Sequence, residues 1–128
     1  MITGAHVLLY SEDPDADRAF LRDVLGFRFV DVGGGWLIFA LPPAEVAVHP
    51  SDEASGQLHG ERQLLEAVLY LMCDDLRSYL ETLADKGVRY SAIAKAPWGI
   101  KTTLALPSGG EIGLYQPTHP TALNLGSG

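Results

Sequence analysis

An internal duplication constrains the fold of this 128-residue chain more than any other feature of its sequence. The segment Phe39–Pro42 aligns with Leu104–Pro107, and Glu45–His49 aligns with Glu111–Tyr115. The offset between the two copies grows only slightly along the chain, as small loop insertions would produce. Two copies are fewer than the three or so repeats that a solenoid needs. The pattern therefore predicts one pseudo-symmetric domain or a tight dimer.

Each copy has the pattern strand–helix–strand–strand–strand. In both copies an amphipathic stretch follows an Asp and is followed by a Gly. This pattern is typical of a helix, because the Asp carboxylate can cap its start and the Gly can end it. The expected elements of the first copy are a strand at Ala5–Tyr10, a helix from Asp13-Pro14 to Gly26, and strands at Phe27–Val32, Trp36–Leu41 and Glu45–His49. Those of the second are a strand at Val68–Cys73, a helix from Asp74-Asp75 to Gly87, and strands at Val88–Ala94, Gly99–Leu106 and Glu111–Gln116. The polar stretch Pro50–Glu66 between the copies shows no period and is expected to be a loop.

The charge balance excludes several classes of partner. Nine basic residues against sixteen acidic ones give a net charge of −7. Without a basic stripe the chain does not suit nucleic acid or an anionic membrane surface. No apolar run approaches the roughly 18 residues that cross a bilayer, and the N-terminus shows no secretory signal pattern. We therefore expect a cytoplasmic protein.

The single cysteine, Cys73, excludes an internal disulfide and a cysteine zinc cluster. It ends the apolar run Val68–Cys73, and a cysteine in such a run is typically a small core residue rather than a nucleophile.

Strand alternation places a set of polar and aromatic residues on one face. In the last strand of the second copy, Ile112 and Leu114 should pack under the helix, so Tyr115 points to the other face. In the first copy, Val46 and Val48 should likewise pack under the helix. A pocket on the opposite face is expected from His6, Tyr10, Glu45, His49, Tyr70, Glu111 and Tyr115. Two tryptophans, Trp36 and Trp98, lie beside glycines. They either stack on a planar or cationic ligand in this pocket, or pack at a sheet edge or at the interface of a dimer.

These features resemble the vicinal oxygen chelate superfamily, which contains glyoxalases, extradiol dioxygenases, and fosfomycin- and bleomycin-resistance proteins. The stretches that carry the resemblance are His6–Phe27, Cys73–Val88, Pro97–Gly99 and Ser108–Tyr115, and the resemblance covers residues 4–117. It implies an α+β fold in which paired βαβββ modules form a curved mixed sheet around a small-molecule cavity, usually within a dimer. The corresponding boundaries are module one at about 4–50, a linker at about 51–66, module two at about 67–117 and a tail at 118–128. The tail is expected to fray unless it docks on a partner.

The resemblance also implies where metal ligands would lie. His6 stands at the first-strand ligand position of the first module. The other three family positions fall on residues whose side chains cannot bind a metal: Val68, Ala47 and Gly113. A displaced set of His6, His49 and Glu111 would be a two-His, one-carboxylate site of the kind that holds iron, and Mn, Ni, Co or Zn also suit such ligands.

Each of these candidates also has a purely structural interpretation. His6 can be a hydrogen-bonded pocket histidine, His49 an exposed histidine at a strand end, and Glu111 a solvated turn carboxylate. For His59 and His119 we expect surface positions.

Three classes of function follow. The first is a homodimeric binding protein that sequesters a small aromatic or cationic compound without a complete metal site, as bleomycin-resistance proteins do. The second is a glyoxalase- or dioxygenase-type enzyme that uses a divalent metal held by His6 with His49 or Glu111. The third is a scaffold whose pocket is vestigial.

Overall fold

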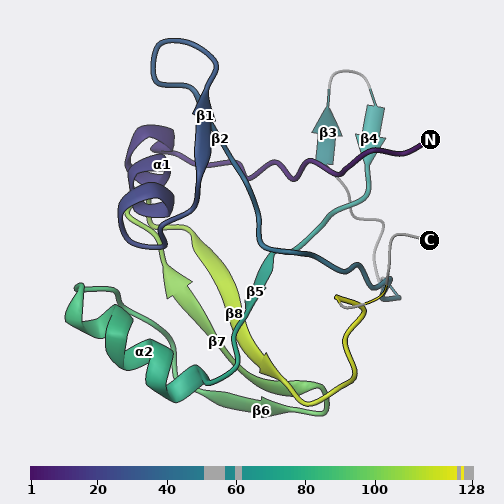
Figure 1. The fold of residues 1–128 in the computed structure, drawn as a ribbon, viewed down its shortest axis with the longest axis vertical. Helices are drawn as coiled ribbons and strands as arrows, with labels where there is room; N and C mark the ends of the chain where they lie inside the picture. Colours follow the sequence, from purple (N-terminus) through teal and green to yellow (C-terminus); the bar gives the residue numbers. More distant parts are fainter. Residues whose placement is uncertain (51–56, 60–61, 124, 126–128) are drawn as a thin grey trace. The chain divides into compact units, whose positions relative to one another are not determined.

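The computed structural model describes residues 1–50, 57–59, 62–123 and 125. Within them the chain forms two helices of ten residues each and strands in three sheets, one four-stranded and two two-stranded (Figure 1). The fold is therefore α+β, as the sequence predicts. In this part of the chain no helix is long and apolar enough to cross a membrane.

Both helices begin and end where the capping residues predict. Helix α1 (Pro14–Asp23) begins after Asp13, whose carboxylate accepts a hydrogen bond from the Ala16 backbone N–H at 3.2 Å. Helix α2 (Leu76–Asp85) begins after Asp75, which accepts from the Ser78 N–H at 3.1 Å. These bonds satisfy donors that the first helical turn leaves unpaired. Gly26 and Gly87 follow the two helices with φ of 72° and 79°, a conformation that glycine adopts without steric cost.

The second copy contains the expected order of elements. Strand β5 (Tyr70–Met72) precedes α2, and strands β6 (Ala94–Ala96), β7 (Gly99–Ala105) and β8 (Glu111–Pro117) follow it. These strands form the four-stranded sheet in the order β5-β8-β7-β6 (Figure 1). β5 runs parallel to β8, and β6 runs antiparallel to β7.

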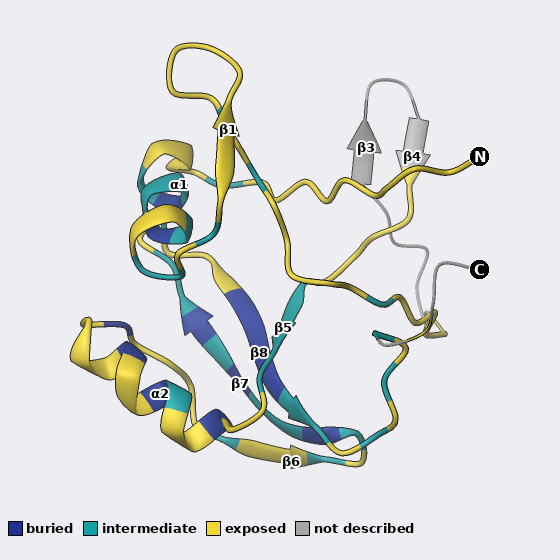
Figure 2. Ribbon diagram, viewed as in Figure 1, coloured by how far each residue is buried: buried dark blue, intermediate teal, exposed yellow. Residues whose placement is uncertain are grey.

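One face of this sheet belongs to the apolar core. Among the described residues, the largest side chains with less than 2 % exposure are Leu76, Leu80, Leu83, Leu104 and Leu114. The side-chain oxygen of Gln116 accepts a hydrogen bond from the Leu76 N–H at 2.9 Å. Because Gln116 shares its strand face with Ile112 and Leu114, this bond places the start of α2 on that face. Gly113 and Tyr115 therefore lie on the face opposite α2, and Figure 2 shows that the middle of β8 is buried.

The first copy departs from the prediction. Strands β1 (Phe29–Asp31) and β2 (Leu37–Phe39) form an antiparallel pair around a glycine turn, but Ala5–Tyr10 and Glu45–His49 form no strand. The prediction of two further strands there was wrong for the single chain, since neither segment forms a β-ladder with another part of the described chain. Val46 and Val48 are each 91 % exposed instead of packed under a helix.

Two other boundaries differ from the prediction. In place of a strand over Val88–Ala94, the chain makes one isolated bridge, from Tyr90 to Leu104, before β6. Within Pro50–Glu66, expected to be a loop, β3 (Gln57–His59) and β4 (Arg62–Leu64) form a short antiparallel pair. Three ladder pairs are too few to impose a visible period on the sequence. Residues 51–56 and 60–61 of that stretch, and the side chain of His59, lie outside the described part.

The chain divides into two compact units. Unit 1 comprises Met1–Ala40 with Ala105–Glu111, and unit 2 comprises Leu41–Leu104 with Ile112–Gly128. Asp17, only 9 % exposed, shows why the β7–β8 turn belongs to unit 1. Its carboxylate accepts hydrogen bonds from the Ser108 backbone N–H at 3.0 Å and from the Ser11 hydroxyl at 2.6 Å. The modules inferred from the repeat, at residues 4–50 and 67–117, follow sequence similarity rather than these units and stay a prediction.

Candidate functional site

Three aromatic rings meet on the face of the unit 2 sheet opposite α2. Tyr70 comes from β5, Trp98 immediately precedes β7, and Tyr115 comes from β8. The ring centroids lie 5.5 Å apart for Tyr70 and Trp98, 5.7 Å for Tyr70 and Tyr115, and 4.8 Å for Trp98 and Tyr115. All three pairs meet edge to face, which is favourable for aromatic quadrupoles. We call Tyr70, Trp98 and Tyr115 the aromatic cluster.

The parallel register of β5 and β8 brings Tyr70 directly onto Gly113. The two residues are ladder partners. A Cβ added at Gly113 would overlap with Cδ1 and Cε1 of the Tyr70 ring and would lie 2.7 Å from its Cγ. The ring therefore occupies the space that a side chain at position 113 would fill.

The Tyr115 hydroxyl connects the cluster to the C-terminal segment. It lies 3.0 Å from Nε2 of His119, and Nδ1 of His119 lies 2.7 Å from the Pro120 carbonyl oxygen. A carbonyl can only accept, so Nδ1 carries the proton and, in the neutral ring, Nε2 accepts from Tyr115. Burial, together with the negative charge of Glu45, raises the pKa of Tyr115 above its ordinary value. The hydroxyl therefore stays protonated near neutral pH.

Glu45 contacts the same C-terminal segment. One carboxylate oxygen accepts a hydrogen bond from the Ala122 backbone N–H at 2.7 Å, and the other lies 3.9 Å from Nε2 of His119. The Thr118 N–H donates to the Trp98 carbonyl at 3.0 Å. The tail is thus docked over residues 118–122, whereas residues 124 and 126–128 lie outside the described part. His119 is half-buried and stacks on Tyr115 instead of lying at the surface as expected.

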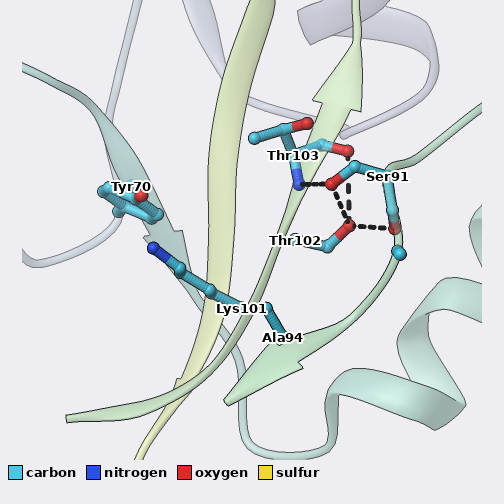
Figure 3. Close-up of a pocket in the computed structure, with 7 residues that line it drawn as sticks. Tyr70, Ser91, Ala94, Lys101, Thr102 and Thr103 are labelled. Atoms are coloured by element: carbon cyan, nitrogen blue, oxygen red, sulfur yellow. Dashed lines mark hydrogen bonds between the residues drawn. The ribbon is translucent and has the colours of Figure 1, made fainter. Parts of the chain in front are cut away.

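A small cavity of about 100 Å³ opens beside Tyr70 (Figure 3). Its lining includes Tyr70, Ser91, Ala94, Lys101, Thr102 and Thr103. The Lys101 ammonium lies 5.3 Å from the centroid of the Trp98 ring, and in Figure 3 its side chain points toward Tyr70. The cavity and the aromatic cluster are therefore contiguous through Tyr70, and Lys101 contacts both.

The remaining predicted pocket residues make none of the contacts described above. His6 and Tyr10 belong to an exposed extended segment of unit 1. Trp36, also in unit 1, is 60 % exposed, and the guanidinium of Arg18 lies 4.5 Å from its ring centroid. His49 and Glu111 are exposed. Of the nine predicted pocket residues, unit 2 brings together Tyr70, Trp98, Tyr115 and, through His119, Glu45.

A metal at the family's ligand positions does not fit the residues present. At Gly113 the Tyr70 ring takes the space of a ligand side chain, and Val68 and Ala47 carry no donor. Across the described ranges, no three His, Cys, Asp or Glu side chains form a group that could hold a metal ion. The displaced set is divided between unit 1, which holds His6 and Glu111, and unit 2, which holds His49. That set stays a prediction.

Cys73 lies beside the site without the properties of a nucleophile. Its thiol is 3.6 Å from the Tyr115 carbonyl oxygen. Burial and the nearby carboxylates of Asp74 and Asp75 raise the pKa of Cys73 to about 11. Since the thiolate is the reactive form, the side chain is inert near neutral pH, which agrees with the structural role expected from the sequence.

Sequence reasoning missed Lys101 and His119. Lys101 is the one charged residue within β7, and alternation alone would have placed it on one face of that strand. Which face meets Tyr70 depends on strand order and register, which the sequence does not show. His119 follows Tyr115 by four residues, beyond the end of β8, where no period applies.

The family follows from a direct match. Residues 4–105 match the model of the Glyoxalase/Bleomycin resistance protein/Dioxygenase superfamily. The chain belongs to this superfamily. The resemblance to the vicinal oxygen chelate proteins that the sequence motifs carry is thereby confirmed.

Solved structures of this superfamily agree with the fold. TnmS3, an antibiotic-binding protein from Streptomyces sp. CB03234, is 24 % identical, with a TM-score of 0.57 over 92 % of this chain and 100 % of its own. A glyoxalase/bleomycin resistance protein from the same strain is 27 % identical, with a TM-score of 0.51 over 83 % of this chain and 93 % of its own. Lactoylglutathione lyase from Agrobacterium tumefaciens is 17 % identical, with a TM-score of 0.59 over 89 % of this chain and 92 % of its own. No curated protein sequence matches the chain significantly.

Proposed function

We propose that this superfamily member binds a small aromatic molecule at the aromatic cluster and retains it without metal chemistry, in the manner of bleomycin-resistance proteins. The observation that carries the proposal is the position of Tyr70 on Gly113. An aromatic ring stands where a metal-ligating side chain would be needed, and a cavity opens beside that ring. Aromatic walls with a few polar groups are typical of small-molecule sites.

The comparisons support this choice without deciding it. One protein of the same fold is an antibiotic-binding protein, and another is a lactoylglutathione lyase, so the fold accommodates both binding and catalysis. The residues of this chain favour binding, because the family's metal positions in the second copy are Val68 and Gly113, which carry no ligand, and the Tyr70 ring occupies the space beside Gly113. A cytoplasmic location stays a prediction from the sequence.

The proposal predicts that planar aromatic compounds raise the melting temperature and change the fluorescence of Trp98. A Trp36→Phe background leaves Trp98 as the sole tryptophan reporter. In that background Tyr70→Ala should weaken binding about 3- to 10-fold, because an aromatic pair contributes about 0.5–1.5 kcal/mol beyond its buried area. Fluorescence titration measures both effects.

Tyr90→Ala is the matched control, since Tyr90 is a 43 % exposed tyrosine of unit 2 outside the cluster. It should leave the affinity unchanged. Unchanged melting curves across a panel of neutral, anionic and cationic aromatic compounds would refute the proposal. Stoichiometric bound metal that His6→Ala removes would instead support the metal-dependent enzyme.

We also propose that the protein is a homodimer. Val46 and Val48 are 91 % exposed, and Leu8 is 51 % exposed, in two segments that the repeat predicts to be strands. Exposed apolar residues with strand patterning favour pairing with another chain. Light scattering at micromolar concentration should give twice the chain mass, and Val46→Asp with Val48→Asp should shift it toward one chain. A monomer for the unmodified protein would contradict this proposal.

A further inference from the structure

Building on the proposed function, we infer that the aromatic ligand carries a carboxylate and that Lys101 binds it from the wall of the cavity. The cavity, the ring of Tyr70 and the Lys101 side chain all belong to unit 2. The inference therefore depends on no contact between the two units.

Lys101 is the one charged side chain among the described residues that line the cavity, in a chain that is acidic as a whole. The net charge is −7, yet in the described part of the chain no carboxylate lies within ion-pair distance of Lys101. The Lys101 ammonium already lies 5.3 Å from the Trp98 ring centroid. A second cation at this ring would be repelled, so a cationic ligand fits this site poorly and an anionic one fits it well.

The hydroxyl groups of the cavity further restrict the chemical class of the ligand. Thr102 donates its proton to the Ser91 carbonyl at 2.7 Å, so the 3.0 Å contact between the two hydroxyls must be a bond donated by Ser91. The Thr103 backbone N–H in turn donates to the Ser91 hydroxyl at 2.9 Å. Both hydroxyl protons are therefore engaged within the protein, as the dashed lines in Figure 3 show.

The donors left for a ligand are the Lys101 ammonium and the hydroxyls of Tyr70 and Thr103. None of the three has a hydrogen-bonding partner among the described residues. A cavity whose described lining offers an ammonium and hydroxyl donors, but no carboxylate, selects a ligand group that accepts hydrogen bonds and carries negative charge.

The cavity is partly open to solvent and has a volume of about 100 Å³. A carboxylate can therefore enter beside Lys101 while most of the attached ring system stays outside. The rest of the aromatic system would extend along Tyr70 toward the aromatic cluster, where Trp98 reports on it.

Three naphthalene probes of equal ring size and different charge test the inference in the Trp36→Phe background: 2-naphthoate, 2-naphthamide and 2-naphthyltrimethylammonium. Fluorescence titration should show 2-naphthoate binding about fivefold more tightly than 2-naphthamide, since the carboxylate adds an ion-pair attraction of about 1 kcal/mol to the hydrogen bond that the ammonium can donate to either probe. The cationic probe should bind most weakly.

Substitutions of Lys101 distinguish the effect of its charge on binding from the effect of its packing. Lys101→Met should remove the advantage of 2-naphthoate by weakening its binding more than that of 2-naphthamide, whereas Lys101→Arg should retain the advantage. Lys95→Met, at an exposed lysine of β6, is the matched control and should change neither affinity. Thermal melts of each variant verify that the fold is intact.

The outcomes distinguish the inference from the function on which it rests. Equal affinity for 2-naphthoate and 2-naphthamide, or equal weakening of both by Lys101→Met, overturns the role of Lys101 and leaves aromatic binding in place. Absence of binding by all three probes overturns both.

Discussion

Gly113→Ala is expected to lower the free energy of unfolding by about 1–3 kcal/mol, the usual cost of inserting a methyl group into a packed site. The new Cβ would overlap with the ring of Tyr70, so the ring must move away from β8. Because Tyr70 lines the cavity, the same substitution should weaken binding of aromatic probes. Urea unfolding and probe titration measure the two effects on one variant.

A double mutant tests whether the overlap with Tyr70 is the cause. In a Tyr70→Ala background the ring is absent, so adding Gly113→Ala should cost much less than it does alone, a coupling that a double-mutant cycle measures. Gly110→Ala is the matched control, because its added Cβ would make only an ordinary 3.5 Å contact with the Ser108 hydroxyl. Equal costs of Gly113→Ala with and without the ring would show that Tyr70 does not occupy that space.

Leu83→Ala is expected to have the largest effect on stability, about 2–5 kcal/mol, as for other buried leucines truncated to alanine. Leu83 lies in α2 with 0 % exposure. Alanine is a better helix former than leucine, so the loss would arise from packing against the core and not from the helix itself. The midpoint of urea unfolding should fall while its slope stays constant.

The control for this prediction is Leu65→Ala. Leu65 is 88 % exposed, and truncations at exposed positions usually stay within about 0.5 kcal/mol. A loss below about 1 kcal/mol for Leu83→Ala would mean that α2 does not share a core with the sheet. In that case the sheet face opposite α2 would also lose the support that positions the aromatic cluster.

The site was only partly predictable from the sequence. Alternation correctly placed Tyr115 on the face opposite Leu114, and Tyr70 and Trp98 were both among the expected pocket residues. The contribution of His119 was not expected, because it depends on the path of the tail after β8. Lys101 was missed for a related reason: its strand face is visible in the sequence, but the neighbours of that face are not.

The first copy shows a second limit of the sequence. Its repeat pattern matches the second copy, yet Ala5–Tyr10 and Glu45–His49 form no strand in the structure. Strand patterning records only that a segment can pair and which side chains would share a face. Whether a ladder forms depends on a neighbouring edge, and within the second copy β8 provides that edge for β5.

The sequence by itself determined the α+β class, the superfamily and the ends of both helices. These features are local, because residues a few positions apart decide them. They are the helix caps at Asp13 and Asp75, the helix ends at Gly26 and Gly87, and the alternation of side chains along the strands. Only the tertiary structure decided that the ring of Tyr70 stands on Gly113 and that the Lys101 side chain points into a cavity beside it. Tyr70 and Gly113 lie far apart in the chain, and their register follows from the packing of the whole sheet, which no short stretch of sequence encodes.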